Sequence, residues 1–360
     1  MASPFSRVPA VLCATERATM NTQTLEQAMA RALELALLGP ATGINPQVGA
    51  VILDASGEIV AEGYHRGSGT PHAEVMALEE LKAKLGSPLP ADLTAVVTLE
   101  PCNHTGKTGP CSQALIEAGI SRVVFAASDP GQLSGGGAEA LASAGIEVVS
   151  GVLEARAEEQ ARVWLTANKL GRPFVSVKWA STLDGRAAAA NGTSQWITGE
   201  EARGDVHARR ATADAILVGT GTVIADNPSL TARNPDGSAL ETQPLRVVLG
   251  ESEIPSNANV LDDRAETLHI RTRSLSKALS QLWGLGVKHV FVEGGPKVAS
   301  AFIADGLVDE FLIYLAPKLL GGPKLAVTDI GIDDISEVMN LKVIEQKQLG
   351  DDIFIRARRA

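Results

Sequence analysis

Pro71-His72-Ala73-Glu74 is the most informative stretch of the chain, and Pro101-Cys102 and Pro110-Cys111 complete it downstream. One imidazole and two thiolates are good zinc ligands, and three protein ligands leave a fourth tetrahedral position open for water. Such an open position is typical of catalytic zinc sites. Cys111 also directly precedes a predicted helix, whose start favours a thiolate. We therefore predict that His72, Cys102 and Cys111 bind zinc.

Glu74 lies two residues beyond His72, near enough to reach a water on the metal without being a ligand itself. Zinc lowers the pKa of such a water to about 7, and a carboxylate can carry its proton to a departing amine. A His-x-Glu pair alone is more often plain surface, and two cysteines can simply be buried. The joint placement, with each of the three ligands directly after a proline, favours hydrolytic deamination with Glu74 as the catalytic acid-base.

Helix and strand patterns alternate along the whole chain, which predicts an α/β fold. The first helix is expected from the capping-box spacing of Thr24-Leu25-Glu26-Gln27 to the Gly39-Pro40 break, and a hairpin follows over 48–62. A helical stretch over 153–170 ends this half, and Gly171-Arg172-Pro173 is typical of a linker. Predicted strands of the second half cover 174–179, 215–219, 245–249, 267–270, 289–293, 310–315 and 352–357.

The 360 residues therefore divide into three predicted parts. We expect a mobile N-terminal extension over 1–21, a first domain over 22–170 and a second domain over 174–360.

Composition limits the partners. A net charge of -10 and an aromatic content of 4% disfavour binding to long nucleic acid. The apolar runs are far shorter than the roughly 20 residues that cross a bilayer, so no membrane association is predicted. Three cysteines are too few for a secreted disulfide scaffold, which favours the cytoplasm.

The first half resembles the cytidine deaminase superfamily, whose general pattern is H-x-E followed by P-C-x-x-C. This chain has eight residues between its two cysteines, and the whole run from Thr98 to Cys111 resembles the deaminase half of the bifunctional riboflavin biosynthesis enzymes. The resemblance implies a three-layer sandwich. It also implies that Asn45, His104 and Lys107 contact a pyrimidine that carries a ribose phosphate.

The second half resembles the reductase half of the same family in Lys178 to Gly185, Ser194 to Thr198, Asp226-Asn227-Pro228 and Ala316-Pro317-Lys318. The chain has no G-x-G-x-x-G motif, so a Rossmann domain is not predicted. The resemblance implies instead a dihydrofolate-reductase-like domain that uses NADPH. The glycine-rich turns at Gly219-Thr220-Gly221-Thr222 and Gly294-Gly295-Pro296 each follow a predicted strand and offer room for phosphate.

Matching positions assign roles in this reductase half. Cofactor contacts are implied for Ala180, Trp196, Thr222, Asp226, Gly294, Gly295, Pro296, Lys297, Val298, Ala299, Ser300 and Ala301. Substrate contacts are implied for Ser194, Arg210, Leu230, Arg233 and Glu293. The two arginines suit a ribose phosphate, because guanidinium forks match phosphate oxygens.

Proton delivery and orientation in the reduction are predicted for Lys178, Asp184 and Glu293, although these residues could equally form an internal ion pair. Arg271 and Arg273 follow a predicted strand, where they could favour the 2′-phosphate of NADPH.

The resemblance as a whole implies a two-step enzyme of riboflavin biosynthesis. It would deaminate 2,5-diamino-6-(5-phosphoribosylamino)pyrimidin-4-one and then reduce the ribosyl side chain to ribityl, with small-molecule substrates and a homo-oligomeric assembly. Two alternatives stay open: a nucleoside or nucleic-acid deaminase with an accessory domain, and a non-catalytic, zinc-stabilised binding module.

Overall fold

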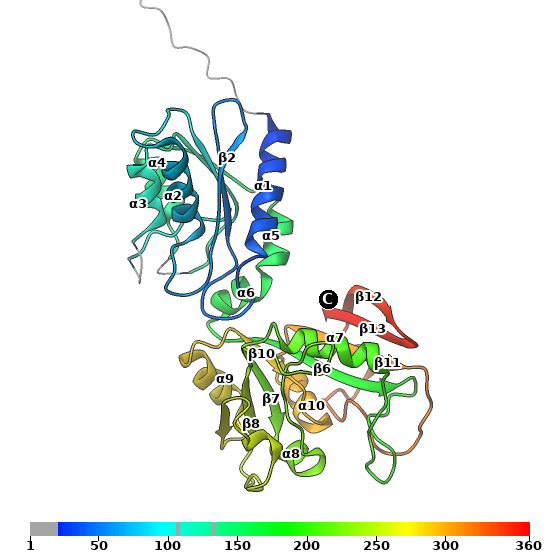
Figure 1. Ribbon diagram of the computed structural model, residues 1–360. Coiled ribbons are helices and arrows are strands. Elements are labelled where there is room, and N and C mark those ends of the chain that lie inside the picture. The colour runs from blue at the N-terminus through cyan, green and yellow to red at the C-terminus, as the bar shows by residue number, and fades with distance from the viewer. Residues whose placement is uncertain (1–20, 106–108, 132–133) are drawn as a thin grey trace, which may run out of the picture.

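Residues 21–105, 109–131 and 134–360 are described by a computed structural model, and they form two sheets, each with its own helices (Figure 1). The expected mobile extension over 1–21 lies outside the described residues except for Asn21. The Asn21 side chain accepts a hydrogen bond from the Gln23 backbone N–H and caps the first helix.

The first sheet has the strand order β2-β1-β3-β4-β5. Its first two strands form the predicted hairpin, while β3, β4 and β5 run parallel to one another. Every residue of β1 and β3 is buried, as expected for strands covered on both faces. The strands are β1 (Gly49–Leu53), β2 (Ile59–Tyr64), β3 (Thr94–Leu99), β4 (Arg122–Ala127) and β5 (Glu147–Ser150).

Helices cover both faces of this sheet, which confirms the three-layer sandwich (Figure 1). One face carries α1 (Thr22–Ala36) and α5 (Glu154–Gln160), and the other carries α2 (Ala73–Leu85), α3 (Cys111–Glu117) and α4 (Gly137–Ser143). Next along the chain, α6 (Arg162–Leu170) leads into the second sheet. None of the described helices is both long and apolar enough to cross a membrane.

The second sheet has the order β12-β13-β11-β6-β10-β7-β8-β9. The strands from β11 to β9 in this order are parallel, whereas β13 and β12 add an antiparallel edge. The strands are β6 (Phe174–Thr182), β7 (Ala215–Gly219), β8 (Leu245–Leu249), β9 (Thr267–Ile270), β10 (His289–Val292), β11 (Glu310–Ala316), β12 (Leu341–Leu349) and β13 (Asp352–Arg359). The helices are α7 (Glu200–Arg210), α8 (Thr220–Asp226), α9 (Leu275–Gly284) and α10 (Pro296–Ala304), with short 3-10 turns at Asn259–Leu261 and Ile335–Glu337.

Four local expectations are corrected by the structure. The prediction that α1 begins with a capping box at Thr24 is wrong, because the helix begins at Thr22 and Asn21 caps it. The turn expected at Gly219 to Thr222 is the start of α8. Strand β12 was not predicted, since its side chains lie mostly at the exposed edge of the sheet and carry no alternating apolar pattern. The helical stretch over 153–170 is broken at Ala161 into α5 and α6.

Close packing of α1 on the first sheet depends on a glycine. A Cβ atom on Gly49 would lie 2.0 Å from the Ala32 carbonyl oxygen and 2.8 Å from the Ala36 backbone nitrogen. Both are backbone atoms of the helix, so neither can move alone. The first sheet and α1 can therefore approach this closely only with glycine at position 49.

We predict that Gly49→Ala lowers the free energy of unfolding by about 2 kcal/mol or more, because the added methyl group overpacks the contact with α1. Gly204→Ala is the matched control, since a Cβ there meets no atom within 4 Å and the residue lies inside α7. It should raise the free energy of unfolding by about 0.5–1 kcal/mol. Urea unfolding of both variants measures this; equal effects of the two substitutions would contradict the packing argument.

Candidate active sites

His72, Cys102 and Cys111 come from three separate segments and meet at one point. His72 is the residue before α2, Cys102 lies just beyond the end of β3, and Cys111 is the first residue of α3. The His72 Nδ1 atom lies 3.2 Å from the Cys111 Sγ atom and 3.5 Å from the Cys102 Sγ atom. The three ligand atoms all lie within 4.8 Å of one another.

These distances fit zinc. Tetrahedral zinc with ordinary Zn–N and Zn–S bond lengths separates its ligand atoms by about 3.5 Å. Both cysteines are free thiols and buried. The pKa of Cys102 is lowered, because the Cys111 thiol and His72 both hydrogen-bond its thiolate. The donor set of one imidazole and two sulfurs is therefore arranged for a metal that prefers nitrogen and thiolate ligands.

Glu74 lies in the first turn of α2, beside this cluster. Its side chain is buried, and burial raises its pKa to about 7. It lines a cavity of about 80 Å³ together with His72 and Cys102. A carboxyl group with this pKa at neutral pH can both take up and release a proton.

Further polar residues line the same cavity, among them Asn45, His65 and His104. Asn45 Nδ2 donates a hydrogen bond to His65 Nε2 at 2.9 Å, and His65 Nδ1 lies 3.2 Å from the Pro71 carbonyl oxygen. Burial lowers the pKa of His65, which fits this neutral, accepting role toward Asn45. Within the described residues, His104 Nδ1 is buried without a hydrogen-bond partner. Lys107, also predicted to contact substrate, lies outside the described residues.

Sequence reasoning missed His65 and Asp129, which both line this cavity. Asp129 stands two residues after β4, at the carboxyl end of a parallel strand, where ligand-binding residues often lie. That position was a usable signal. His65 had none, because its contact with Asn45 joins two chain segments whose pairing the sequence does not reveal.

In the second half the structure brings Lys178, Arg210 and Glu293 together. Arg210 donates two hydrogen bonds to the Glu293 carboxylate, from Nε at 2.5 Å and from Nη2 at 2.9 Å. Lys178 Nζ lies 3.8 Å from Glu293 Oε2. Burial alone would raise the pKa of Glu293, but the charges of Arg210 and Lys178 lower it to about 2. Burial also lowers the pKa of Lys178. Glu293 is therefore a fixed anion between two cations.

Asp184 has other partners than Lys178, Arg210 and Glu293 among the described residues. Its carboxylate accepts hydrogen bonds from the Thr182 hydroxyl and from the backbone N–H groups of Leu320 and Gly321. These contacts tie the turn after β6 to the loop after β11, and among the described contacts of Asp184 none is with Lys178 or Glu293.

Of the remaining predicted substrate residues, Arg233 is linked to Arg210 through Thr231. Arg210 also donates to the Thr231 carbonyl oxygen, and Arg233 Nε donates to the Thr231 hydroxyl. Leu230 is buried and Ser194 is half-buried.

Two glycine-containing turns lie side by side at the carboxyl ends of β7 and β10. A Cβ on Gly219 would lie 2.7 Å from the Val298 side chain, and one on Gly294 would lie 2.6 Å from it. The Gly295 N–H donates to the Thr222 hydroxyl at 2.9 Å. The starts of α8 and α10 are thereby joined, and backbone N–H groups at helix starts suit a phosphate. The Val298 side chain fills the space beside Gly219 and Gly294, and the Gly295 N–H is already bonded to Thr222.

The other predicted cofactor residues are not equally accessible. Ala299 and Ser300 are buried, and the Ser300 hydroxyl accepts a hydrogen bond from the Thr328 N–H. Ala180 and Pro296 are half-buried, whereas Trp196, Asp226, Lys297 and Ala301 are exposed. Arg271 and Arg273 are paired with Glu253 and Glu251 on the surface.

Comparison with known proteins accounts for both halves. The family described as the cytidine and deoxycytidylate deaminase zinc-binding region matches residues 22–127, and the RibD C-terminal domain family matches residues 173–355. The riboflavin biosynthesis protein RibD of Mycobacterium tuberculosis H37Rv is 46% identical over 335 residues, which cover 92% of this chain and 97% of that protein.

Solved structures agree. RibD of Acinetobacter baumannii superposes with a TM-score of 0.86 at 35% identity, covering 94% of this chain and 100% of that one. A diaminohydroxyphosphoribosylaminopyrimidine deaminase/5-amino-6-(5-phosphoribosylamino)uracil reductase from Thermotoga maritima has a TM-score of 0.84 at 36% identity, covering 94% and 99%. Both fold families predicted from the sequence are confirmed.

We predict that the purified chain binds one zinc ion and that Cys102→Ser and Cys111→Ser each abolish it, because a hydroxyl is a poor substitute for a thiolate ligand. Elemental analysis after dialysis measures the zinc content. Ser112→Ala is the matched control: Ser112 is equally buried beside Cys111 but donates to Asn103, so its loss should leave zinc in place. Full zinc content in both cysteine variants would exclude this ligand set.

The stability that the Glu293 ion pairs contribute should depend on pH. The pKa of Glu293 is about 2 in the folded chain and ordinarily 4.5, so its ion pairs stabilise the fold above pH 4.5 and lose this effect as pH falls toward 2. The stability difference between wild type and Glu293→Gln should therefore shrink by about 1 kcal/mol from pH 5.5 to 3.5. Urea unfolding at both pH values measures it, with exposed Glu117→Gln on α3 as control. A constant difference would refute the charge assignment.

Proposed function

This chain belongs to the RibD family of bifunctional riboflavin biosynthesis proteins, and from that premise we propose which of its residues carry out the two reactions. It is a zinc-dependent deaminase and an NADPH-dependent reductase. The first reaction removes an amino group of 2,5-diamino-6-(5-phosphoribosylamino)pyrimidin-4-one as ammonia. The second reduces the ribosyl side chain of the product to ribityl. The alternative of a nucleoside or nucleic-acid deaminase with an accessory domain is not favoured by these relatives.

We assign the deaminase to residues 22–170 and the reductase to residues 174–360. In the deaminase, His72, Cys102 and Cys111 hold zinc, which when bound supplies an acidified water. Glu74, whose pKa is raised to about 7, would accept a proton from the attacking water and donate one to the departing amine. The observation that carries this proposal is the buried Glu74 carboxyl group, which lines one small cavity together with His72 and Cys102.

Asn45 and His104 orient the pyrimidine, and Lys107 is the proposed contact for its phosphate. The Asn45 amide is held by the neutral His65 ring, so that its oxygen stays available to accept from an amino or ring N–H group of the substrate. The unpartnered Nδ1 atom of His104 supports a polar contact with substrate.

In the reductase, NADPH supplies the hydride when bound. We propose that Gly294, Gly295 and Thr222, where the starts of α8 and α10 are joined, contact the phosphates of this cofactor. We propose Ala180, Trp196, Asp226 and the segment 296–301 as further parts of the cofactor site. Lys178, with its lowered pKa, is the best proton donor to the reacting side chain, because Glu293 holds it in place and burial makes it a stronger acid.

Arg233 is the stronger candidate for the substrate phosphate. Both Arg210 nitrogens that form a fork are taken by Glu293, whereas in the described contacts only Nε of Arg233 has a hydrogen-bond partner. Arg210, Ser194, Leu230 and Glu293 then shape the remaining substrate site. For Asp184 we propose that its effect on proton transfer is indirect, through the two loops that it joins.

We propose further that the chain works in the cytoplasm as a homo-oligomer joined through its reductase halves. A reducing compartment suits a site that needs two free thiols. Apolar side chains exposed on and before β12 support an interface there, among them Ile335, Val338 and Val343.

The deaminase assignment predicts that Glu74→Gln lowers the rate of ammonia release about 1,000-fold while zinc stays bound, since the amide cannot carry the proton. Reduction of separately supplied deaminated substrate should continue at the wild-type rate. The measurement follows ammonia and NADPH absorbance separately, starting from the diaminopyrimidine ribotide with and without NADPH.

Ammonia should appear without NADPH, and absorbance should fall only when NADPH is present. Glu79→Gln, an exposed glutamate on the same helix, is the control and should behave as wild type. Undiminished ammonia release by Glu74→Gln would remove Glu74 from the mechanism.

A further inference from the structure

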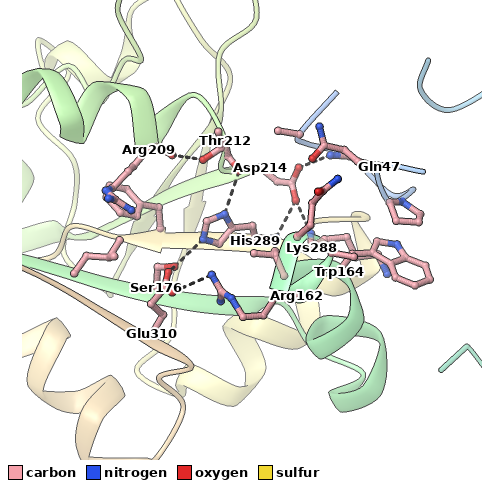
Figure 2. A pocket seen from close by; sticks show the side chains of 18 of the residues that line it. Gln47, Arg162, Trp164, Ser176, Arg209, Thr212, Asp214, Lys288, His289 and Glu310 are labelled. Atoms are coloured by element: carbon pink, nitrogen blue, oxygen red, sulfur yellow. Dashed lines mark hydrogen bonds and ion pairs between the residues drawn. The ribbon is translucent and has the colours of Figure 1, made fainter. Parts of the chain in front are cut away.

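A cavity of about 460 Å³ lies where the two halves meet (Figure 2). The loop that contains Asn45 and Gln47 forms one wall, and His289 and Ser176 of the second sheet line another. Asn45, Pro46 and Trp164 also line the small deaminase cavity. The loop that contains Asn45 and Pro46, together with Trp164 of α6, is therefore shared by the deaminase cavity and the larger cavity.

Hydrogen bonds hold this loop both before and after Asn45. The Gly43 N–H donates to the Asp214 Oδ1 atom at 2.6 Å, and Trp164 Nε1 donates to the Ile44 carbonyl oxygen at 2.9 Å. Gln47 closes the far end of the loop by donating to the Gly39 carbonyl oxygen at 2.7 Å. The backbone that presents Asn45 is thus fixed by a carboxylate from one half and an indole from α6.

Asp214 itself belongs to the reductase half, directly before β7. Its Oδ2 atom accepts hydrogen bonds of 2.8 Å from the backbone N–H groups of Lys288 and His289, at the start of β10 (Figure 2). Hydrogen bonds to a charged acceptor are about twice as strong as neutral ones. The carboxylate is therefore anchored in the second sheet, and the Asn45 loop takes its position from it.

We propose that Asp214 is a positioning residue of the deaminase reaction: a carboxylate of the reductase half that sets the loop carrying the substrate contact Asn45. This inference rests on the proposed role of Asn45. A misplaced Asn45 weakens binding of substrate and transition state alike, since the residue takes no part in proton transfer. The effect is therefore a raised KM with an unchanged kcat.

Asp309 provides a matched control. It too is an aspartate of the reductase half that holds a strand by a backbone N–H, here that of Val175, and it pairs with Arg172 at 2.7 Å. The described contacts of Asp309 do not include the loop over 41–47. A loss of general stability would affect both aspartate variants, whereas a positioning effect appears only at Asp214.

The experiment compares zinc-loaded, full-length Asp214→Asn, Asp309→Asn, Trp164→Phe and Asn45→Ala with wild type by ammonia release, with kcat and KM determined separately and thermal unfolding alongside. We expect Asp214→Asn and Trp164→Phe to raise the deaminase KM about fivefold to tenfold, because each loses a loop contact, with kcat within about twofold of wild type. Asp309→Asn should leave both constants unchanged. Trp164→Phe removes the indole N–H group and makes a partly exposed ring smaller, so it tests the loop even if Asp214→Asn folds poorly.

An unchanged KM in folded Asp214→Asn overturns the inference, as does an equal rise in Asp309→Asn. If Asp214→Asn does not fold, an unchanged KM in Trp164→Phe overturns it. Asn45→Ala distinguishes the proposed substrate contact of Asn45 from the positioning role of Asp214. If it leaves KM unchanged, the proposed role of Asn45 is wrong; if it raises KM while the loop variants do not, only the positioning role of Asp214 is wrong.

Discussion

One nitrogen and two sulfur atoms from distant parts of the chain must meet within a few ångströms, and the first half of the structure is arranged around this requirement. His72 and Cys111 stand at the starts of α2 and α3, which pack on the same face of the sheet. Cys102 follows the central strand β3. Helix starts favour thiolates and leave backbone N–H groups free, as the bond from Cys111 N–H to the Cys102 sulfur illustrates.

Features that depend on residue type and local pattern could be predicted from the sequence, whereas contacts between distant segments could not. The cluster of His72, Cys102 and Cys111 could be predicted because a metal site demands those residue types. Strands β1 and β3 could be predicted because they are fully buried and largely apolar. Strand β12 could not be found, because an exposed edge places few demands on its side chains. The contact between Asn45 and His65, and the pairing of Arg210 with Glu293, depend on tertiary structure that no local pattern reports.

The two halves differ in how they use charge. The deaminase cavity buries a carboxyl group whose pKa of about 7 lets it exchange protons, whereas the reductase fixes Glu293 as an anion between Arg210 and Lys178. The second arrangement holds the half-buried Lys178 beside Glu293, and burial lowers the pKa of this lysine. Ion pairs of Arg162 with Glu310, and of Glu159 with Arg356 and Arg358, join the halves between these sites.

X-ray absorption at the zinc edge of the purified full-length chain tests the ligand assignment most directly, because the spectrum counts sulfur and lighter neighbours of the metal. The assignment predicts two sulfur neighbours and two lighter ones, one of them with the multiple-scattering signature of imidazole. A spectrum without sulfur, or with four sulfur neighbours, would contradict the site on which the whole account is built.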